Sequence, residues 1–417
     1  MRPLIKQIVL CTFGTLLEWY DFSLFAALAP IIAEIFFPHS NHFSAMMSTF
    51  VVFASGFIMR PIGAIFFGHL GDKIGRKSTL LITIFIMTIS TAAIGLIPTD
   101  LTISTLLLVF FRLAQGLAAS GEYPGGITLL AEQLKANKRG FIASFGIFAA
   151  PAGIFIGTLA CAIIAKLIDH ANMIQWGWRV PFLLGAPFGL IGYFIRKSLL
   201  ESEEFQIAKR EKLLIKIPLL SLIKEHRRGF IALLCLYILS SVSFYVNFIY
   251  LSGYAVNVHK YSTASMLYVN AVITLVYAMT IPLFGLISDY LGKRFLMAGA
   301  CISMICFIYP LFLYILNGDI NMQVWGQAFI SIMIGMFVGP LAMLSADYFP
   351  TQVRYTGVGM SLNISTAIFG GTTPLVCAWL ARISNNPIMP AYYFIGIAAL
   401  ALVVIVLTKP DIKNEVI

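Results

Sequence analysis

The sequence of 417 residues is 59% hydrophobic and only 11% charged, with a mean hydropathy of +0.90 and a net charge of +10. A soluble globular domain is about 45–50% apolar and about 25% charged, so this chain lacks the charged side chains that would cover its surface in water. The composition therefore excludes a cytosolic enzyme, a secreted domain and a disordered chain.

Twelve apolar runs are long enough to cross a bilayer, because a hydrocarbon core of about 30 Å needs about 20 residues of helix. The runs cover approximately residues 5–36, 44–70, 78–98, 103–131, 140–167, 178–196, 229–257, 264–288, 295–316, 323–346, 356–382 and 389–408. The first run follows a basic start, as in a signal peptide, but it contains Glu18 and Asp21 and lacks a small-residue cleavage site. We therefore expect it to be retained as a span. The sequence predicts an all-α membrane protein with 12 transmembrane helices.

Lysine and arginine are distributed unevenly over the connections between the runs. Of the 28 residues, 22 fall on the side of the two termini, two lie inside runs, and four lie on the opposite side, namely Lys166, Arg179, Lys260 and Arg382. Because basic residues concentrate on the cytoplasmic side of a membrane, we expect both termini in the cytoplasm. The net charge of +10 then reflects this topology and contact with anionic lipid. Binding to nucleic acid is not expected.

Two motifs recur at nearly the same offset. The segment from Gly68 to Lys77 is repeated 217 residues later as Gly285 to Arg294. The spacing Glu132-x6-Arg139 is repeated 215 residues later as Asp347-x6-Arg354. Two independent motifs with similar offsets indicate a duplicated unit of six helices.

One long charged connection divides the twelve runs into six and six. We predict an N-terminal six-helix bundle at residues 1–196, a cytoplasmic linker at 197–228 and a C-terminal six-helix bundle at 229–417. Repeats of this kind place a substrate site near the middle of the membrane, between the two halves.

Further motifs are spread from the first run to the last. They are Leu17-Glu18-Trp19-Tyr20-Asp21-Phe22, Arg60-Pro61-Ile62-Gly63, Arg112-Leu113-Ala114-Gln115-Gly116, Gly121-Glu122-Tyr123, Trp176-Gly177-Trp178-Arg179-Val180-Pro181-Phe182, Phe349-Pro350-Thr351-x-x-Arg354 and Met389-Pro390-Ala391-Tyr392-Tyr393. The segment Gly68 to Lys77 resembles the loop between helices 2 and 3 of the major facilitator superfamily. The full set is similar to the metabolite:proton symporter family, which includes carriers of proline and betaine, α-ketoglutarate, citrate and shikimate.

The proline/betaine branch of that family is the most similar, with two departures. The sequence ends about nine residues after the last predicted span, so we expect it to lack the coiled-coil tail of some osmosensing relatives. Asp347 stands where the family favours Glu.

The repeated loop has residue types suited to a latch. Gly71 and Gly75 permit a tight turn, Asp72 can cap a helix N-terminus, and Arg76 can pair with a carboxylate of a neighbouring loop. The resemblance implies that the latch holds the cytoplasmic side closed when the carrier faces outward. The predicted gating residues are Gly71, Asp72, Arg76, Glu132, Arg139, Asp289, Arg294, Asp347 and Arg354. The alternative is a solvated basic loop that serves topology only.

Ionisable side chains inside spans are costly and usually functional. The rise of a helix places Glu18 and Asp21 at the depth of Arg112, and Arg60 at the depth of Glu122, so we expect these as the two interacting sets. Three carboxylates and two guanidinium groups leave one acid without a partner. Desolvation favours the neutral form of such an acid, so that it can take up and release a proton near neutral pH. We predict a proton-coupling role within this set, with Asp21 or Glu18 favoured over Glu122. The alternative is that all five side chains form fixed ion pairs that only hold the helices of the N-terminal half together.

The C-terminal half has almost no charge inside its spans and offers aromatic and amide side chains instead. Aromatic faces can hold an ammonium group, and Arg112 could hold a carboxylate. The predicted substrate-binding residues of both halves are Trp19, Tyr20, Phe22, Tyr123, Phe244, Tyr245, Asn247, Phe248, Tyr277 and Asn363. The alternative is that these side chains serve packing or anchor the protein at the membrane interface.

These features together predict a secondary active transporter rather than an enzyme, since the motifs of zinc proteases, α/β-hydrolases and phosphate loops do not occur. The favoured activity is proton-coupled symport of a small zwitterion such as an amino acid or betaine. A mono- or dicarboxylate carrier, and less so an antiporter, remain open. We expect a monomer in the bacterial inner membrane, with no metal site and no cofactor other than the coupling proton.

Overall fold

The computed structural model describes residues 2–38, 42–99, 103–133, 138–261 and 263–409. These residues form helices and no β-strand. The helices of the first part are α1 (Arg2–Ala27), α2 (Ala29–Phe36), α3 (His42–Lys73), α4 (Arg76–Leu96), α5 (Ser104–Glu132), α6 (Arg139–Leu167), α7 (His170–Asn172), the π-helix η1 (Met173–Gly177) and α8 (Arg179–Lys197). Two short helices follow, α9 (Glu203–Arg210) and α10 (Pro218–Lys224).

The helices of the second part begin at Arg227. They are α11 (Arg227–Tyr245), η2 (Val246–Tyr250), α12 (Leu251–Asn257), α13 (Thr263–Leu291), α14 (Lys293–Leu316), α15 (Ile320–Asp347), α16 (Thr351–Ile364), η3 (Ser365–Gly370), α17 (Gly371–Ile383) and α18 (Met389–Leu407). The π-helical segments η2 and η3 join their neighbours into continuous apolar spans, Arg227–Val256 and Thr351–Ile383.

Eleven helices within the described residues are long and apolar enough to cross a membrane. A twelfth span is obtained when His170–Gly177 and Arg179–Lys197, bent by 43°, are counted as one. The predicted all-α membrane architecture is therefore confirmed. One predicted run is divided, because α1 ends before the short helix α2, which carries Pro30 in its first turn.

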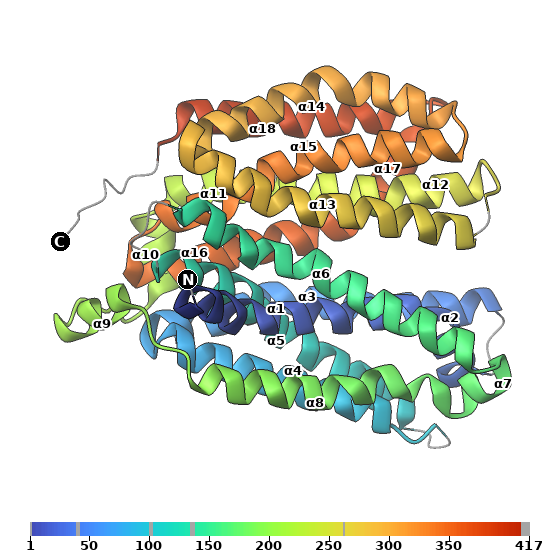
Figure 1. Cartoon of the computed structure of the whole chain (residues 1–417), viewed down its shortest axis with the longest axis horizontal. Coiled ribbons are helices and arrows are strands. Elements are labelled where there is room, and N and C mark those ends of the chain that lie inside the picture. Colours follow the sequence, from blue (N-terminus) through green and yellow to red (C-terminus); the bar gives the residue numbers. More distant parts are fainter. Residues whose placement is uncertain (1, 39–41, 100–102, 134–137, 262, 410–417) are drawn as a thin grey trace.

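The long helices run side by side, with α1 to α8 in the lower part of Figure 1 and α11 to α18 in the upper part. Short helices α9 and α10 lie at one end of the bundle, and α2, α7 and α12 lie at the other. We call the end that carries Lys73, Lys138 and Lys293 the basic end. The two groups of helices meet where α6 packs against α13 and α15, and where α16 packs against α3 and α5.

The repeated loop adopts the same backbone turn in both copies. Gly75, between α3 and α4, has φ of +110°, and Gly292, between α13 and α14, has φ of +91°. This left-handed region is unfavourable for side chains other than that of glycine. A Cβ atom on Gly75 would also lie 2.2 Å from a carboxylate oxygen of Glu201. The turn therefore requires glycine at both equivalent positions.

Candidate functional site

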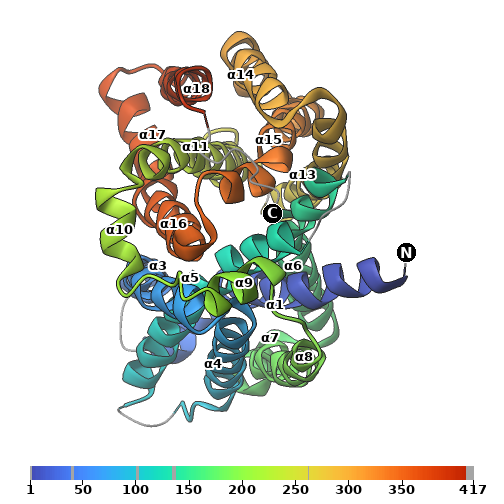
Figure 2. The ribbon, with the colours of Figure 1, turned by 90° about the vertical axis from the view of Figure 1, so that its left-hand side faces the viewer.

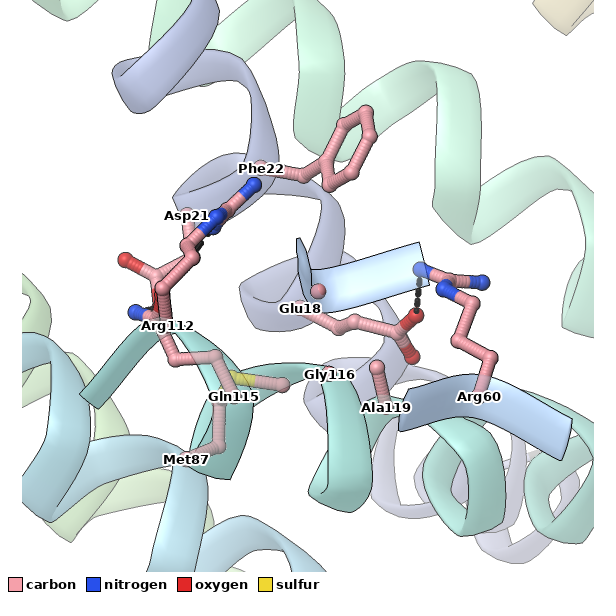
Figure 3. Close-up of a pocket in the computed structure, with 10 residues that line it drawn as sticks. Glu18, Asp21, Phe22, Arg60, Met87, Arg112, Gln115, Gly116 and Ala119 are labelled. Carbon is pink, nitrogen blue, oxygen red and sulfur yellow. Dashed lines mark hydrogen bonds and ion pairs between the residues drawn. The ribbon is translucent and has the colours of Figure 1, made fainter. Parts of the chain in front are cut away.

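Charged side chains from three helices line one buried pocket in the first part of the chain (Figure 3). Helix α1 contributes Glu18 and Asp21, α3 contributes Arg60, and α5 contributes Arg112 and Gln115. Each of these five residues is at most 3% exposed, and the pocket has an empty volume of about 280 Å³. We call this group the polar cage.

One side of the polar cage is an ion pair between Arg60 and Glu18. Arg60 Nη2 lies 3.1 Å from Glu18 Oε1, as the dashed line in Figure 3 shows. The Arg60 guanidinium also lies within 5.8 Å of three ring centroids, those of Trp19, Phe22 and Phe57. Arg60 Nη1 and Glu18 Oε2 have no hydrogen-bond partner among the described residues. The pair is therefore fixed by packing, and each partner retains one unused polar atom.

The other side of the polar cage is built around Asp21. Its Oδ2 accepts hydrogen bonds from the Thr91 hydroxyl and from Gln115 Nε2, the latter at 2.6 Å. Gln115 Oε1 in turn accepts from Arg112 Nη1 at 3.0 Å, so the amide connects Arg112 to Asp21. Among the described residues no cation lies within ion-pair distance of Asp21, and Asp21 Oδ1 and Arg112 Nε and Nη2 have no hydrogen-bond partner. Asp21 is thus a buried acid whose link to a guanidinium is indirect.

Glu122, the third acid, lies outside the polar cage and pairs with Arg196. Glu122 Oε1 lies 2.5 Å from Arg196 Nη1, and Glu122 Oε2 accepts from the Thr83 hydroxyl at 2.7 Å. Arg196 also donates to the carbonyl oxygens of Leu10 and Cys11, at 3.1 and 2.8 Å. This pair joins α1, α4, α5 and α8 inside the first part of the chain.

The predicted pairing of the buried acids with the buried arginines was wrong. Arg60 pairs with Glu18 and not with Glu122. The partner of Glu122 is Arg196, which lies near the C-terminal end of α8 and was not among the predicted charges inside the spans. Depth along a helix follows from its rise, but the direction of a side chain around the helix depends on packing. With Arg196 included, three guanidinium groups accompany the three acids.

Removing the charge of Arg196 is expected to destabilise the protein strongly. Arg196→Gln leaves the Glu122 carboxylate buried without its cation, which typically costs about 3–5 kcal/mol. The measurement is the unfolding of purified protein in detergent. Glu122→Gln/Arg196→Gln should recover part of the loss, because it removes both charges, and Arg382→Gln at an exposed position is the control. A single variant as stable as the parent protein would show that the pair does not clamp these helices.

A second pocket lies between the two groups of helices and has an empty volume of about 580 Å³. Its lining is Trp19, Tyr123, Ile147, Ala150, Pro151, Ile154, Tyr237, Ser240, Ser241, Phe244, Tyr245, Tyr277, Leu362 and Thr366. None of these lining residues is charged. The Trp19 ring contacts the Tyr123 ring at 5.9 Å within the first part of the chain. It also contacts the Phe244 ring of the second part at 6.5 Å, across the interface. We call this pocket the aromatic cavity.

Five of the predicted substrate-binding residues line the aromatic cavity, and the other five lie elsewhere. Those in the lining are Trp19, Tyr123, Phe244, Tyr245 and Tyr277. Phe22 lines the polar cage, and Phe248 stacks behind Phe244 with ring centroids 4.7 Å apart.

The remaining three are bonded away from both pocket linings. The Tyr20 hydroxyl donates to the Pro181 carbonyl at 2.9 Å, and Asn247 donates to Ser331 Oγ at 2.9 Å. Asn363 donates to the Ser120 carbonyl at 2.9 Å. The predicted contact of all ten residues with a substrate stays a prediction.

At the basic end, a carboxylate of each part of the chain accepts hydrogen bonds from backbone N–H groups of the other part. Asp72 accepts from Tyr355 N and Thr356 N of α16, at 3.1 and 2.9 Å. Asp289, its equivalent in the repeat, accepts from Gly140 N and Phe141 N in the first turn of α6, at 2.7 and 2.9 Å. Asp289 therefore caps the N-terminus of α6 across the interface. Asp72, for which capping was predicted, instead binds N–H groups in the second turn of α16.

Glu132 is the centre of an ion-pair network beside these two aspartates. It lies 2.8 Å from Arg76 Nη2 and 2.9 Å from Arg354 Nη1, and the side chains of Arg76 and Glu132 are completely buried. Arg76 Nη2 also donates to the Thr351 carbonyl at 2.6 Å. We call Asp72, Arg76, Glu132, Asp289 and Arg354 the gate. It joins the two parts of the chain at the basic end through hydrogen bonds and ion pairs.

The other predicted gating residues lie beside the gate. Gly71 packs its backbone against the Tyr355 ring, and Arg139 donates to the Ala131 carbonyl at 3.2 Å. Asp347 pairs with Lys293, and Arg294 donates to the Ile405 carbonyl, both within the second part of the chain.

Two acidic residues of the connection after α8 also join the gate, and sequence reasoning missed them. Glu201 accepts from Arg76 N and Lys77 N, both at 3.1 Å, and so caps α4. Burial raises the pKa of the Glu201 carboxyl despite these hydrogen bonds. Glu204 pairs with Arg354 and accepts from the Thr351 hydroxyl at 3.1 Å. The sequence feature that could have indicated their role is the group of acidic residues directly after the sixth predicted span.

The family model for the Major Facilitator Superfamily matches residues 11–367. The chain belongs to the major facilitator superfamily. A proline/betaine transporter of Salmonella typhimurium is 33% identical over 410 residues, covering 95% of this chain and 82% of that one. A glycine betaine/proline/ectoine/pipecolic acid transporter of Dickeya dadantii is 32% identical over 409 residues, covering 95% and 81%. The resemblance to the proline/betaine branch is confirmed.

A solved structure of the proton:xylose symporter XylE, bound to 6-bromo-6-deoxy-D-glucose, has the same fold. It superposes with a TM-score of 0.81 at 17% identity, over 96% of this chain and 94% of that one. The major facilitator protein described here is therefore a multi-pass membrane transporter and not an enzyme.

Proposed function

We propose that this major facilitator transporter couples proton movement to the uptake of a small zwitterionic solute, such as proline or a betaine. The observation that carries the proposal is the contact between its two pockets. The Arg60 guanidinium of the polar cage lies 5.6 Å from the Trp19 ring, which lines the aromatic cavity. A solute in the cavity and a proton in the cage would therefore act on adjoining side chains.

The aromatic cavity has the chemistry of an ammonium site. Trp19, Tyr123, Phe244, Tyr245 and Tyr277 offer ring faces without a charged neighbour in the lining, and such faces attract quaternary ammonium groups. Hydroxyl groups of Tyr237, Ser240, Ser241 and Thr366 line the same cavity and could donate to a carboxylate. The substrates named for the relatives, which are proline, betaine, ectoine and pipecolic acid, support this choice.

A carboxylate carrier is the second candidate, and Arg112 favours it. Two nitrogen atoms of Arg112, Nε and Nη2, have no hydrogen-bond partner among the described residues, although the side chain is buried. A guanidinium group with unused donors suits a carboxylate of the substrate.

We propose that the basic end faces the cytoplasm of a bacterium and that the protein lies in its inner membrane. The excess of basic residues at this end supports the orientation. The closed gate then corresponds to a carrier that is shut toward the cytoplasm. Opening it would require the two parts of the chain to rock apart, as in alternating access. We propose that one chain suffices for transport, since both pockets are built by a single chain.

The proposed function is tested with purified protein in two steps. A thermal-shift screen against amino acids, betaines and dicarboxylates identifies the solute that stabilises the fold. Uptake of this solute into proteoliposomes is then measured with and without an inward pH gradient. Accumulation of a zwitterion only with the gradient is expected. Accumulation of a dicarboxylate instead would select the second candidate, and uptake without any effect of the gradient would reject proton coupling.

The ring face of Phe244 is expected to contribute to solute affinity. Phe244→Leu removes the ring but keeps an apolar side chain, and it should raise KM for a quaternary ammonium solute by the equivalent of about 0.5–2 kcal/mol. Uptake kinetics give KM, and Phe110→Leu at an exposed position of α5 serves as the control. The same KM in both variants would place the solute outside this wall of the cavity.

A further inference from the structure

The connection between α8 and α11 contains two short helices of different character. Helix α9 exposes polar and charged side chains, among them Glu203, Gln206 and Lys209. Helix α10 and the residues before it expose large apolar side chains instead. The exposed fractions are 49% for Leu213, 56% for Ile217, 46% for Leu220 and 53% for Ile223. Only the second helix therefore presents an apolar surface outside the bundle.

The exposed apolar side chains lie along one face of α10. Ile217, Leu220 and Ile223 follow one another at intervals of three residues, which places them on the same side of a helix. The opposite side is bound to the protein, where Leu222 is completely buried and Pro218 and Ser221 are also buried. The apolar face is therefore available to an external partner while the helix is held in place.

The position of α10 brings this face to the edge of the membrane. Its last residue, Lys224, lies three residues before Arg227, where the span of α11 begins. Three residues of chain reach about 10 Å at most. In Figure 2 α10 lies at the rim of the bundle beside α3 and α16, whereas α9 lies over its middle. A bilayer surrounds a membrane protein at its rim, so α10 is placed where it could reach the boundary between headgroups and acyl chains.

Basic residues surround the apolar face. From residue 209 to 228 the chain has seven of them against two acids, Glu211 and Glu225; the basic residues are Lys209, Arg210, Lys212, Lys216, Lys224, Arg227 and Arg228. All seven are exposed. An apolar helical face flanked by lysine and arginine is the pattern of helices that lie in the membrane surface and attract anionic lipids.

We propose that α10 is an interfacial helix that inserts Leu220 and Ile223 among lipid chains and binds anionic phospholipid headgroups through Lys216 and Lys224. The helix packs against α3 in the first part of the chain and against α11 and α16 in the second. The lipid therefore binds to a helix that contacts both sides of the closed gate. This proposal concerns a partner of the linker and does not depend on which solute is transported.

Depth of insertion is measured with a fluorescent label at single positions of the full-length protein. Cys306, which is exposed, is first replaced by Ser. Ile223→Cys and Leu220→Cys then carry an environment-sensitive nitrobenzoxadiazole label, and Gln206→Cys on α9 is the matched control. Both labelled positions are exposed, so the substitutions leave the core intact. Vesicles consist of phosphatidylcholine alone or of equal parts phosphatidylcholine and phosphatidylglycerol.

Labels at positions 220 and 223 are expected to emit at shorter wavelength and to be quenched by lipids with a nitroxide near the headgroup. The label at 206 is expected to behave as in water. Emission typical of water at 220 and 223 would overturn the insertion and leave a soluble protein as the partner of this face.

Headgroup selectivity is measured by comparing quenching at position 223 by nitroxide-labelled phosphatidylglycerol and phosphatidylcholine. Phosphatidylglycerol is expected to quench more strongly. Lys216→Gln/Lys224→Gln should reduce this preference by about five-fold per lysine, which is the attraction of one basic residue to an anionic surface. Lys209→Gln/Arg210→Gln removes the same charge from α9 and should change it less. Equal effects of the two double variants, or equal quenching by both lipids, would reject the assignment of Lys216 and Lys224.

Discussion

Asp21→Asn is expected to abolish accumulation of solute against its gradient, while exchange of solute across the membrane continues. Asp21 is the acid of the polar cage without a cation at ion-pair distance among the described residues, and Gln115 connects it to Arg112. An asparagine can accept hydrogen bonds from Thr91 and Gln115 but cannot take up a proton. The carrier would therefore rock between its states without coupling.

Proteoliposomes separate the two activities. Uptake driven by a pH gradient should fall to the equilibrium distribution, and counterflow of labelled solute should remain measurable. Glu34→Gln is the matched control, because Glu34 is an exposed acid outside the polar cage. If Asp21→Asn still concentrates the solute, the proton site is elsewhere, and Glu18→Gln is the next variant to measure.

Glu132→Gln is expected to open the gate. It removes the carboxylate shared by Arg76 and Arg354, and the Arg76 side chain has no exposure to water. Loss of one partner of a buried ion pair costs about 3–5 kcal/mol, and here the cost falls on the state in which the two parts of the chain are joined. The equilibrium should therefore shift toward a state that is open at the basic end.

The opening can be observed as a distance between spin labels on the two parts of the chain. Lys73 and Tyr290 are exposed residues at the basic end, one in each part, and cysteines at these positions can carry the labels. A longer distance should become populated in Glu132→Gln. Asp347→Asn is the control, since Asp347 is the repeat equivalent of Glu132 but pairs with Lys293 within one part. An equal shift in both variants, or none in Glu132→Gln, would show that Glu132 does not hold the gate.

The architecture could be predicted from the sequence because lipid imposes long apolar helices with internally satisfied backbones. The run predicted at 229–257 corresponds to the span Arg227–Val256, and the run at 356–382 lies within Thr351–Ile383. The π-helical segments inside these two spans were not predicted, since the spans were identified by the length of their apolar runs, which an extra residue in one turn does not interrupt.

The pairing of buried charges could not be predicted, for a different reason. Hydropathy and helical rise indicate that Glu18, Arg60 and Glu122 are inside the membrane, but not which way each side chain points. The connection of Asp21 to Arg112 through Gln115 depends on the angle at which α1 and α5 pack. Arg196 was misjudged because it lies within two residues of a helix end, where loop and span are not distinguished by composition.

Asp72 and Asp289 each accept hydrogen bonds from two backbone N–H groups of the opposite part of the chain. A backbone donor is present in every amino acid except proline, so the hydrogen bond to Phe141 or Thr356 makes no demand on the side chain there. The two aspartates have no such freedom, because their carboxylates make the contact. Random mutagenesis followed by selection for transport should therefore recover more exchanges at Phe141, which is partly exposed, than at either aspartate. The contact between the two parts of the chain therefore depends on the identity of two acidic residues and on the course of the main chain.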